Sequence, residues 1–293
     1  MDLDELKAFT AVARTHSFSE AAKELFITQP AVSKRIAALE EHLNHSLFDR
    51  LGKDVSLTEA GKALLPNAEK ILQSVHSTER SIRELSGEIV GNLHVATSHH
   101  IGLHHLPPVL RAFASQHRNV NLQFEFLDSE QAHEKVIRGE CELAVVTLAP
   151  KLEPPLEAQT IWHDPLKFVV STEHPLANSK RVSLQELSKE AAILPDLNTF
   201  TGRLVKSTFD QKGLPLTLNM ATNYLETIKM MVSVGLGWSV LPTTLIDTHM
   251  RILEPGVKLS RKLGVIKHQK RSLGNAAKAF YAVLEQQQEG QTG

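Results

Sequence analysis

The sequence predicts an α/β protein in three parts: an all-α-rich N-terminal domain with a small wing, a long connecting helix, and a two-lobed C-terminal α/β domain. Three observations predict this architecture. Residues 17–43 hold two amphipathic helical patterns with a short turn between them, and residues 58–85 carry an apolar seam of heptad period. From residue 91 onward, short apolar runs alternate with helical patterns. A chain of 293 residues is long enough for two or three such domains.

Residues 17–43 are typical of a helix-turn-helix. Ser19 is the expected cap of the first helix, and Phe26 begins a tight corner. Thr28 can accept from free amides at the start of the second helix, where Pro30 is tolerated in the first turn. The stripe expected to be buried on the second helix consists of Val32, Ile36, Leu39 and Leu43.

The other face of the second helix is polar near its start, where a recognition helix meets base edges. Residues 47–57 then form a predicted hairpin, with Gly52 in its turn and cations near its tip, where a wing lies beside the phosphate backbone. The residues expected to contact DNA are Thr28, Gln29, Pro30, Ser33, Lys34, Arg35, Arg50 and Lys53.

Charge does not by itself favour DNA as the partner. Residues 1–60 contain seven cations and ten anions, a net charge of -3, so any attraction must come from a local patch. Four of the seven cations lie on the second helix or the hairpin, which supports such a patch. Two short helices and a turn also occur in all-helical domains that never touch DNA, and that alternative stays open on the pattern alone.

Composition and cysteine usage bound the class of protein. The net charge of -1 favours neither a membrane surface nor a strongly charged partner. The single cysteine, Cys141, excludes an internal disulfide and indicates a reducing compartment. The acidic start lacks the basic and apolar regions of a signal peptide, and the longest weakly polar stretch, residues 230–242, is too short to span a bilayer. We therefore expect a cytoplasmic protein without a membrane partner.

The connecting helix, residues 58–87 with Thr58 as its cap, carries a seam that needs a partner. Its apolar positions follow one another at alternating spacings of four and three, as in a coiled coil. The seam can pack on the later domain of its own chain, or on a second copy, and we favour the dimer because DNA targets are usually two-fold symmetric. The seam consists of Leu64, Ala68, Ile71, Val75, Thr78, Ile82 and Leu85.

Residues 91–293 alternate between strand and helix patterns, and the alternation restarts after an irregular, proline-containing connection. This predicts two lobes, about 91–162 with 266–293 and 163–265. Strands are expected at residues 92–97, 121–127, 141–147, 166–170, 191–194, 217–221, 238–241 and 262–267, and helices at 103–116, 130–138, 184–187, 201–211, 224–234 and 273–287.

The chain resembles the LysR-type transcriptional regulators over essentially its whole length. The residues that carry the likeness are Phe9, Ala21, Ala22, Leu25, Gln29, Pro30, Ser33, Ile36, Leu39, Glu40, residues 47–50, residues 57–61, residues 174–176 and residues 235–242. The resemblance implies a winged helix-turn-helix in residues 1–60 and an effector-binding domain with the two-lobed plan of periplasmic binding proteins. It also implies a homotetramer, an operator with an inverted repeat, and RNA polymerase as a further partner.

Ligands of open α/β folds bind beyond the carboxyl ends of the strands, near helix starts. In the resembled family such loops line a cleft for a small-molecule effector. Amides and hydroxyls with few fixed cations favour a small anion. Each threonine here can instead be a simple helix cap. The expected effector-binding residues are Thr97, Ser98, His99, His100, Thr147, Thr199, Phe200, Thr201, Gly202 and Asn223.

Four histidines, His99, His100, His104 and His105, crowd one short stretch. Imidazoles at this spacing can bind zinc, nickel or copper. No carboxylate lies inside the stretch, so a closed site would need ligands from distant parts of the chain. We therefore expect no metal and no cofactor, and we favour effector contact by His99 or His100.

Enzyme signatures are absent from the sequence. It contains no Gly-x-Ser-x-Gly, no Walker loop, no dinucleotide fingerprint and no His-Glu-x-x-His. The competing hypothesis is a small-molecule binding protein or enzyme with an accessory helix-turn-helix, which would not shift DNA from upstream of its own gene in a gel.

Overall fold

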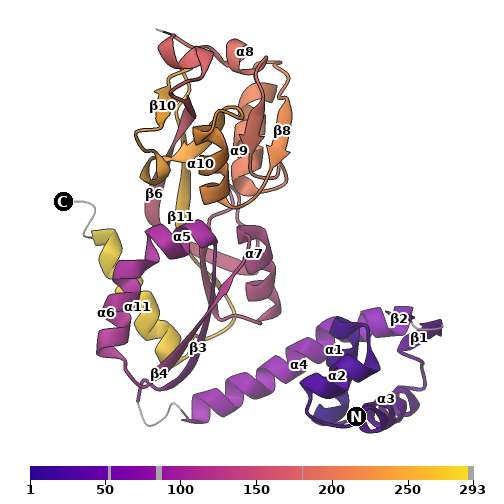
Figure 1. Ribbon diagram of the computed structural model, residues 1–293. Helices are drawn as coiled ribbons and strands as arrows, with labels where there is room; N and C mark the ends of the chain where they lie inside the picture. The colour runs from indigo at the N-terminus through magenta and orange to yellow at the C-terminus, as the bar shows by residue number, and fades with distance from the viewer. Residues whose placement is uncertain (52–53, 84–87, 180, 290–293) are drawn as a thin grey trace. The chain divides into compact units, whose positions relative to one another are not determined.

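The computed structural model describes residues 1–51, 54–83, 88–179 and 181–289 (Figure 1). Contacts between residues divide the chain into two compact units, Met1–Ser86 and Gly87–Gly293. Each unit contains its own hydrophobic core.

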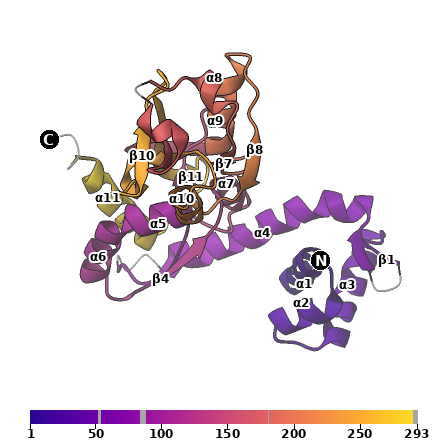
Figure 2. The same ribbon diagram turned by 45° about the horizontal axis from the view of Figure 1, so that its top comes forward.

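Unit 1 is a winged helix-turn-helix continued by a long helix. The helices α1, α2 and α3 gather at the end of α4 that follows the β1–β2 hairpin (Figures 1 and 2). The predicted stripe of α3 faces the core, where Val32, Ile36 and Leu39 are fully buried and Leu43 is half-buried. The elements are α1 (Leu3–Thr15), α2 (Phe18–Glu24), α3 (Gln29–Leu43), β1 (Phe48–Leu51), β2 (Asp54–Leu57) and α4 (Glu59–Arg83).

The helix caps differ in part from the prediction. Ser17, not Ser19, caps α2, because its hydroxyl accepts from the amide of Glu20 at 3.3 Å while Ser19 already lies inside the helix. Thr28 is the N-cap of α3, yet its hydroxyl accepts no capping hydrogen bond from the described amides of that helix. Thr58 caps α4 as expected, because its Oγ1 accepts from the amide of Gly61 at 3.0 Å.

The predicted wing is confirmed as an antiparallel hairpin. Leu51 of β1 pairs with Asp54 of β2, and the backbone of Arg50 pairs with Val55. Gly52 and Lys53, both part of the predicted turn, lie outside the described residues, and so does the side chain of Arg50.

The apolar seam of α4 divides into two parts. Ala68 is fully buried and Leu64 packs beside it, both against the core of unit 1. Farther along the helix, Ile71 and Ile82 are 37% and 64% exposed, and they lie with Val75 on one open face. The first turns of the seam therefore pack within unit 1, which corrects the prediction of one continuous seam that faces a partner. Leu85 lies outside the described residues.

Unit 2 is built on a mixed sheet of strand order β10-β6-β11-β5-β3-β4, with β9 also pairing with β6. The strand β3 pairs in parallel with β4 on one side and β5 on the other, whereas β11 runs antiparallel to β5 and β6. A second, parallel pair joins β7 and β8. The strands are β3 (Gly91–Thr97), β4 (Val120–Phe126), β5 (Leu143–Thr147), β6 (Leu156–Ser171), β7 (Ala192–Leu194), β8 (Leu218–Ala221), β9 (Ser239–Pro242), β10 (Met250–Leu253) and β11 (Leu259–His268).

The helices of unit 2 fall into two lobes, as Figure 1 shows. Lobe 1 contains α5, α6, α7 and α11, and lobe 2 contains α8, α9 and α10. The α-helices are α5 (His99–His104), α6 (Leu106–Gln116), α7 (Ser129–Arg138), α8 (Leu184–Leu187), α9 (Phe200–Asp210), α10 (Leu225–Ser233) and α11 (Asn275–Glu289).

Two long strands cross between the lobes. On β6, Trp162 belongs to the core of lobe 1 and Leu166 to that of lobe 2. On β11, Leu259 packs in lobe 2 and Leu263 in lobe 1, a few residues before the predicted crossing at 265–266. The register of the two strands shifts beside Gly264, where a Cβ atom would lie 2.0 Å from the carbonyl oxygen of Gln159.

Three elements differ from the prediction. The strand β6 begins at Leu156, ten residues before the predicted strand at 166–170, because its first half pairs with β11 in lobe 1. The single helix predicted at 103–116 is two helices, α5 and α6, which meet at His105. The strand β10 follows no pattern identified in the sequence, and it pairs with the lobe 2 half of β6. Among the described residues, no helix combines the length and apolarity that crossing a bilayer requires.

Candidate functional site

The start of α3 carries predicted DNA-facing residues on the outside of unit 1. Thr28, Gln29, Pro30 and Lys34 are exposed, and Ser33 is half-buried. The amide Nε2 of Gln29 donates to Oγ of Ser33 at 3.0 Å, so the two side chains lie on one face, one turn apart. Amide and hydroxyl groups of this kind can both donate to and accept from base edges in a major groove.

Arg35 is held against the neighbouring helix. Its Nη2 lies 2.8 Å from Oδ2 of Asp4 at the start of α1, and its side chain is 31% exposed. An arginine that contacts DNA from this position must first leave Asp4. Of the described cations predicted to face DNA, Lys34 is exposed and Arg35 is engaged.

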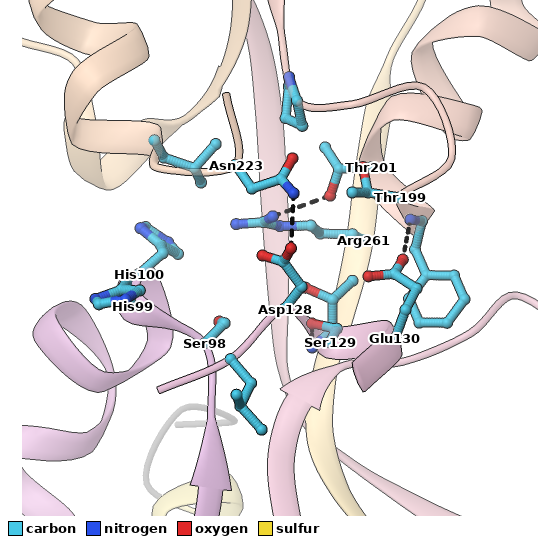
Figure 3. Close-up of a pocket in the computed structure, with 15 residues that line it drawn as sticks. Ser98, His99, His100, Asp128, Ser129, Glu130, Thr199, Thr201, Asn223 and Arg261 are labelled. Carbon is cyan, nitrogen blue, oxygen red and sulfur yellow. Dashed lines mark hydrogen bonds between the residues drawn. The ribbon is translucent and has the colours of Figure 1, made fainter. Parts of the chain in front are cut away.

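Unit 2 contains a cleft between its lobes, at the carboxyl ends of β3, β4 and β5 and the beginnings of α7, α9 and α10 (Figure 3). It encloses about 60 Å³. The cleft is lined by Ser98, His99, His100, Leu127, Asp128, Ser129, Glu130, Thr147, Pro195, Thr199, Phe200, Thr201, Asn223, Leu225 and Arg261.

Eight of the ten predicted effector-binding residues line this cleft: Ser98, His99, His100, Thr147, Thr199, Phe200, Thr201 and Asn223. Thr97 does not, because its buried hydroxyl donates to the carbonyl oxygen of Val145 at 2.8 Å within the sheet. Gly202 does not either. Its amide donates to Thr199, and it packs so closely under the preceding loop that a Cβ atom would lie 2.1 Å from the carbonyl oxygen of Asp196.

Arg261 of β11 is the buried cation that the sequence analysis missed. Its Nε donates to Oδ2 of Asp164 on β6 at 2.8 Å, and its Nη1 donates to Oγ1 of Thr201 at 3.0 Å. The side chains of Arg261 and Asp164 are only 8% and 2% exposed. The third nitrogen, Nη2, is buried without a hydrogen-bond partner among the described residues, and Figure 3 shows the guanidinium between His100 and Thr201.

His100 is a second buried polar group at the cleft. Burial, followed by the positive charge of Arg261, lowers the pKa of its imidazole to about 2, so the ring is neutral near pH 7. Neither ring nitrogen has a hydrogen-bond partner among the described residues, although Nε2 lies 3.8 Å from Oδ2 of Asp164.

Backbone and side-chain hydrogen bonds join the lobes across the cleft. Asn223, just before α10, donates from Nδ2 to Oδ2 of Asp128 at 2.7 Å, and its Oδ1 accepts from the amide of Asp196 at 3.0 Å. The carboxylate of Glu130 on α7 accepts from the amide of Phe200 at the start of α9. Burial raises the pKa of Glu130, and its hydrogen bonds oppose that rise. Asp128 and Glu130 were not among the predicted residues. They follow the second strand of lobe 1, so the rule that ligands bind beyond strand ends applied to their loop as well.

His99 and His104, two more histidines of the cluster at residues 99–105, lie at the edge of the cleft. His99 stacks on Phe126 at a ring-centroid distance of 5.1 Å and meets the edge of Tyr224 at 4.8 Å. His104 is exposed, and its Nε2 lies 2.9 Å from Oε1 of Glu226 on α10 of lobe 2.

Each of the two units matches a known protein family. Residues 3–62 match the family model of the bacterial regulatory helix-turn-helix proteins of the lysR family, and residues 86–289 match the LysR substrate binding domain. The chain is 30% identical over 239 residues to the HTH-type transcriptional activator CmpR of Synechocystis sp., which covers 82% of this chain and 78% of that protein.

Solved structures share the fold at lower identity. Full-length CbnR complexed with its target DNA superposes with a TM-score of 0.66 at 21% identity, over 98% of this chain and 100% of that one. The effector binding domain of QuiR in complex with shikimate superposes with a TM-score of 0.62 at 20% identity, over 69% of this chain and 98% of that one.

Proposed function

Because this chain belongs to the LysR family and is a transcriptional regulator with a helix-turn-helix domain and an effector-binding domain, we propose that a small organic anion between its lobes controls its action on DNA. The observation that carries the proposal is Nη2 of Arg261, which is buried at the cleft without a partner among the described residues. Since the relatives of this chain are named transcriptional regulators, an enzyme with an accessory helix-turn-helix, the competing hypothesis, is not needed to explain the sequence.

The geometry of Arg261 favours an oxygen acceptor. Leaving a buried donor without a partner costs on the order of 1–3 kcal/mol, and a ligand oxygen bound to Nη2 would recover that cost. Asp164 and Thr201 hold the guanidinium from its other sides, so Nη2 is fixed in place before any ligand arrives. An anionic oxygen makes the strongest hydrogen bond with such a donor.

The acidic residues of the cleft narrow the kinds of anion that would bind there. Asp128 and Glu130 offer carboxylate acceptors, and Ser98 and Thr201 offer hydroxyls. A plain oxyanion would meet these carboxylates unfavourably, whereas hydroxyl or ammonium groups on the ligand would donate to them. We therefore infer a carboxylate that also carries hydroxyl or amino groups; shikimate, the ligand named for QuiR, has this chemistry.

The small volume of the cleft connects binding to a change of shape. About 60 Å³ holds only a few water molecules, so an organic ligand must part Asn223 from Asp128 or move one lobe. A ligand that binds the more open state better shifts the population toward it, by no more than its difference in affinity for the two states.

For DNA, we propose that the start of α3 reads bases while the wing contacts phosphate. Two copies would be held together by the open face of α4 formed by Ile71, Val75, Thr78 and Ile82, with pairs of dimers as the final assembly. A two-fold dimer matches an operator with an inverted repeat.

The anion proposal is tested by thermal unfolding of the full-length chain. Shikimate, its methyl ester and a panel of small hydroxy and amino acids are added in excess. At a hundredfold excess over Kd, binding stabilises the folded state by about 2.7 kcal/mol, which raises the Tm of a domain of this size by roughly 5–10 °C. We expect a rise with at least one free carboxylate and none with its ester.

A matched variant tests the role of Arg261. Replacing Arg261 alone would leave Asp164 as an unpaired buried charge, so Arg261→Gln is combined with Asp164→Asn. This pair should abolish the ligand-induced rise, while Arg203→Gln, which removes a half-exposed cation near the cleft, should preserve it. A rise caused equally by acid and ester, or one that survives the double substitution, contradicts the proposal.

A further inference from the structure

We propose that His100, His104 and Glu226 form a binding site for one divalent transition-metal ion, with Zn²⁺ as the representative ion, at the edge of the cleft. Metal binding was not expected from the sequence, because no carboxylate lies inside residues 99–105. The fold supplies the missing ligand from lobe 2, since Glu226 lies 122 residues after His104. This site shares His100 with the lining of the cleft, but it uses neither Arg261 nor its unpartnered Nη2.

The geometry of the three side chains suits a metal ion. His100 and His104 lie one turn apart on α5, and their ring centroids are 4.9 Å apart with planes inclined by 37°. One ligand atom from each of the two histidines and from Glu226 can be chosen so that all three lie within 4.8 Å of one another. Zinc binds imidazole nitrogen and carboxylate oxygen at about 2.0–2.2 Å, so small side-chain rotations would bring the three onto one ion.

The burial of His100 and its unpartnered ring nitrogens are the second observation that favours a metal site. Its side chain is 4% exposed, and both ring nitrogens are buried without a hydrogen-bond partner among the described residues. A neutral imidazole nitrogen of this kind carries the lone pair that a metal ion binds. A simple ion pair between His104 and Glu226 would leave both nitrogens of His100 without a partner, whereas a bound ion would take up one of them.

Two other groups of possible ligands are weaker. His100 and His105 also lie near Asp164, but Oδ2 of Asp164 already accepts from Arg261, so this carboxylate is less available to bind an ion. A third group joins His94, Glu125 and Cys141.

In that third group, Glu125 is paired with Lys135 at 3.0 Å, and burial raises the pKa of the Cys141 thiol to about 11. A metal ion there would have to displace both Lys135 and the proton of the thiol. The group that contains Glu226 has neither handicap.

An ion at this site would tie the lobes together. His100 and His104 belong to α5 of lobe 1, and Glu226 belongs to α10 of lobe 2. Metal binding would therefore favour the arrangement in which the three side chains meet, and it would raise the free energy needed to separate α5 from α10.

The test uses untagged, full-length protein stripped of metal with EDTA and then dialysed. Calorimetric titration with ZnCl₂ should show one ion bound per chain. His104→Gln and Glu226→Gln should each weaken that binding at least about tenfold, since even the loss of an outer partner of a metal ligand commonly has an effect of this size. Both residues are partly exposed, so these variants should fold.

Control variants separate this site from the alternatives. His117→Gln at the end of α6, His105→Gln and Cys141→Ser should all bind zinc as the wild type does. Thermal unfolding in EDTA measures any purely structural role of the pair between His104 and Glu226. Only the zinc-dependent rise in Tm reports the site, and it should be lost in His104→Gln and Glu226→Gln.

Three results would overturn the proposal: no zinc binding by the wild type below about 1 mM, binding that survives both site substitutions, or binding lost in His105→Gln or Cys141→Ser. None of them bears on the anion, because the carboxylate titrations use protein that has been stripped of metal and then dialysed free of EDTA. Conversely, failure of the carboxylates to bind would leave the zinc titration unaffected.

Discussion

Asn223 of lobe 2 donates a hydrogen bond to Asp128 of lobe 1, with 2.7 Å between Nδ2 and Oδ2, and so closes the cleft from one side. The same amide side chain accepts from the backbone of Asp196, which fixes its orientation within lobe 2. One side chain therefore links the loop after β4 to the loop after β7, and any ligand that enters must compete with it.

Asn223→Ala should loosen the closed arrangement. Hydrogen exchange measured by mass spectrometry should become faster at the starts of α7 and α9, while the buried centre of β3 keeps its protection. Asn198→Ala, on the same side of the cleft, serves as the control. Unchanged exchange at both helix starts in Asn223→Ala would show that this hydrogen bond does not hold the lobes.

Gln29→Ala should reduce the discrimination between a cognate operator and a scrambled site. The amide of Gln29 can make two hydrogen bonds to one base, and such a pair is worth about 1–3 kcal/mol of discrimination. Fluorescence anisotropy on both DNA sequences measures the ratio of affinities. His42→Ala, on the exposed far end of α3, should leave that ratio intact. If the ratio for Gln29→Ala equals that of the wild type, Gln29 does not read bases.

Asp4→Asn should increase operator affinity, because it releases Arg35 from its ion pair. The pair is partly exposed and is worth at most about 1 kcal/mol, so the expected gain is no more than about fivefold. Glu20→Gln removes the same charge elsewhere on unit 1 and gives the background effect. The gain should vanish in an Arg35→Ala background, and a gain that persists there would mean that Arg35 does not contact DNA.

Ile71→Asp combined with Val75→Asp should dissociate the assembly. Both residues lie on the open face of α4, and a carboxylate buried in an apolar seam costs several kcal/mol. Sedimentation velocity should show smaller species, and operator affinity should fall with them. Ala63→Asp combined with His76→Asp adds the same charge at exposed positions outside that face and should sediment as the wild type. Wild-type sedimentation of the seam variant would show that this face does not join two copies.

Acidification below about pH 6.5 should destabilise unit 2 through its buried histidines. Burial lowers the pKa of His100 to about 2 and that of His133 to about 4, from an ordinary value of 6.5. Below pH 6.5 the unfolded chain binds protons that the folded chain does not, so stability falls as pH falls, by at most about 1.4 kcal/mol per pH unit for each imidazole.

The corresponding measurement is Tm in EDTA between pH 7 and pH 4.5. His133→Gln should flatten the dependence, whereas His42→Gln on the surface of unit 1 should not. Identical slopes for the wild type and His133→Gln would mean that His133 is protonated in the folded chain.

Local patterns in the sequence were sufficient to predict most helices and strands and many of the residues that line the cleft. The burial of Val32, Ile36 and Leu39 follows from helical spacing, and Ser98, Thr199 and Asn223 follow from the rule that ligands lie beyond strand ends. These inferences succeed because each depends on a few neighbouring residues.

Residues that depend on long-range pairing were missed. Arg261 lies inside a strand, and only the pairing of β11 with β6 places it beside Asp164 at the cleft. Glu226 reaches His104 only once lobe 2 has folded against lobe 1. In the same way, Leu64 and Ala68 fit a heptad seam, yet the nearby helices of unit 1 cover them before any partner can.

The most direct test of the central claim is a crystal structure of the full-length chain grown with the free carboxylate that raises Tm most in the thermal unfolding panel. We expect electron density for this ligand between the lobes, with a carboxylate oxygen within hydrogen-bonding distance of Nη2 of Arg261. Ligand density confined to other surfaces, with none beside Arg261 at saturating ligand, would contradict the claim.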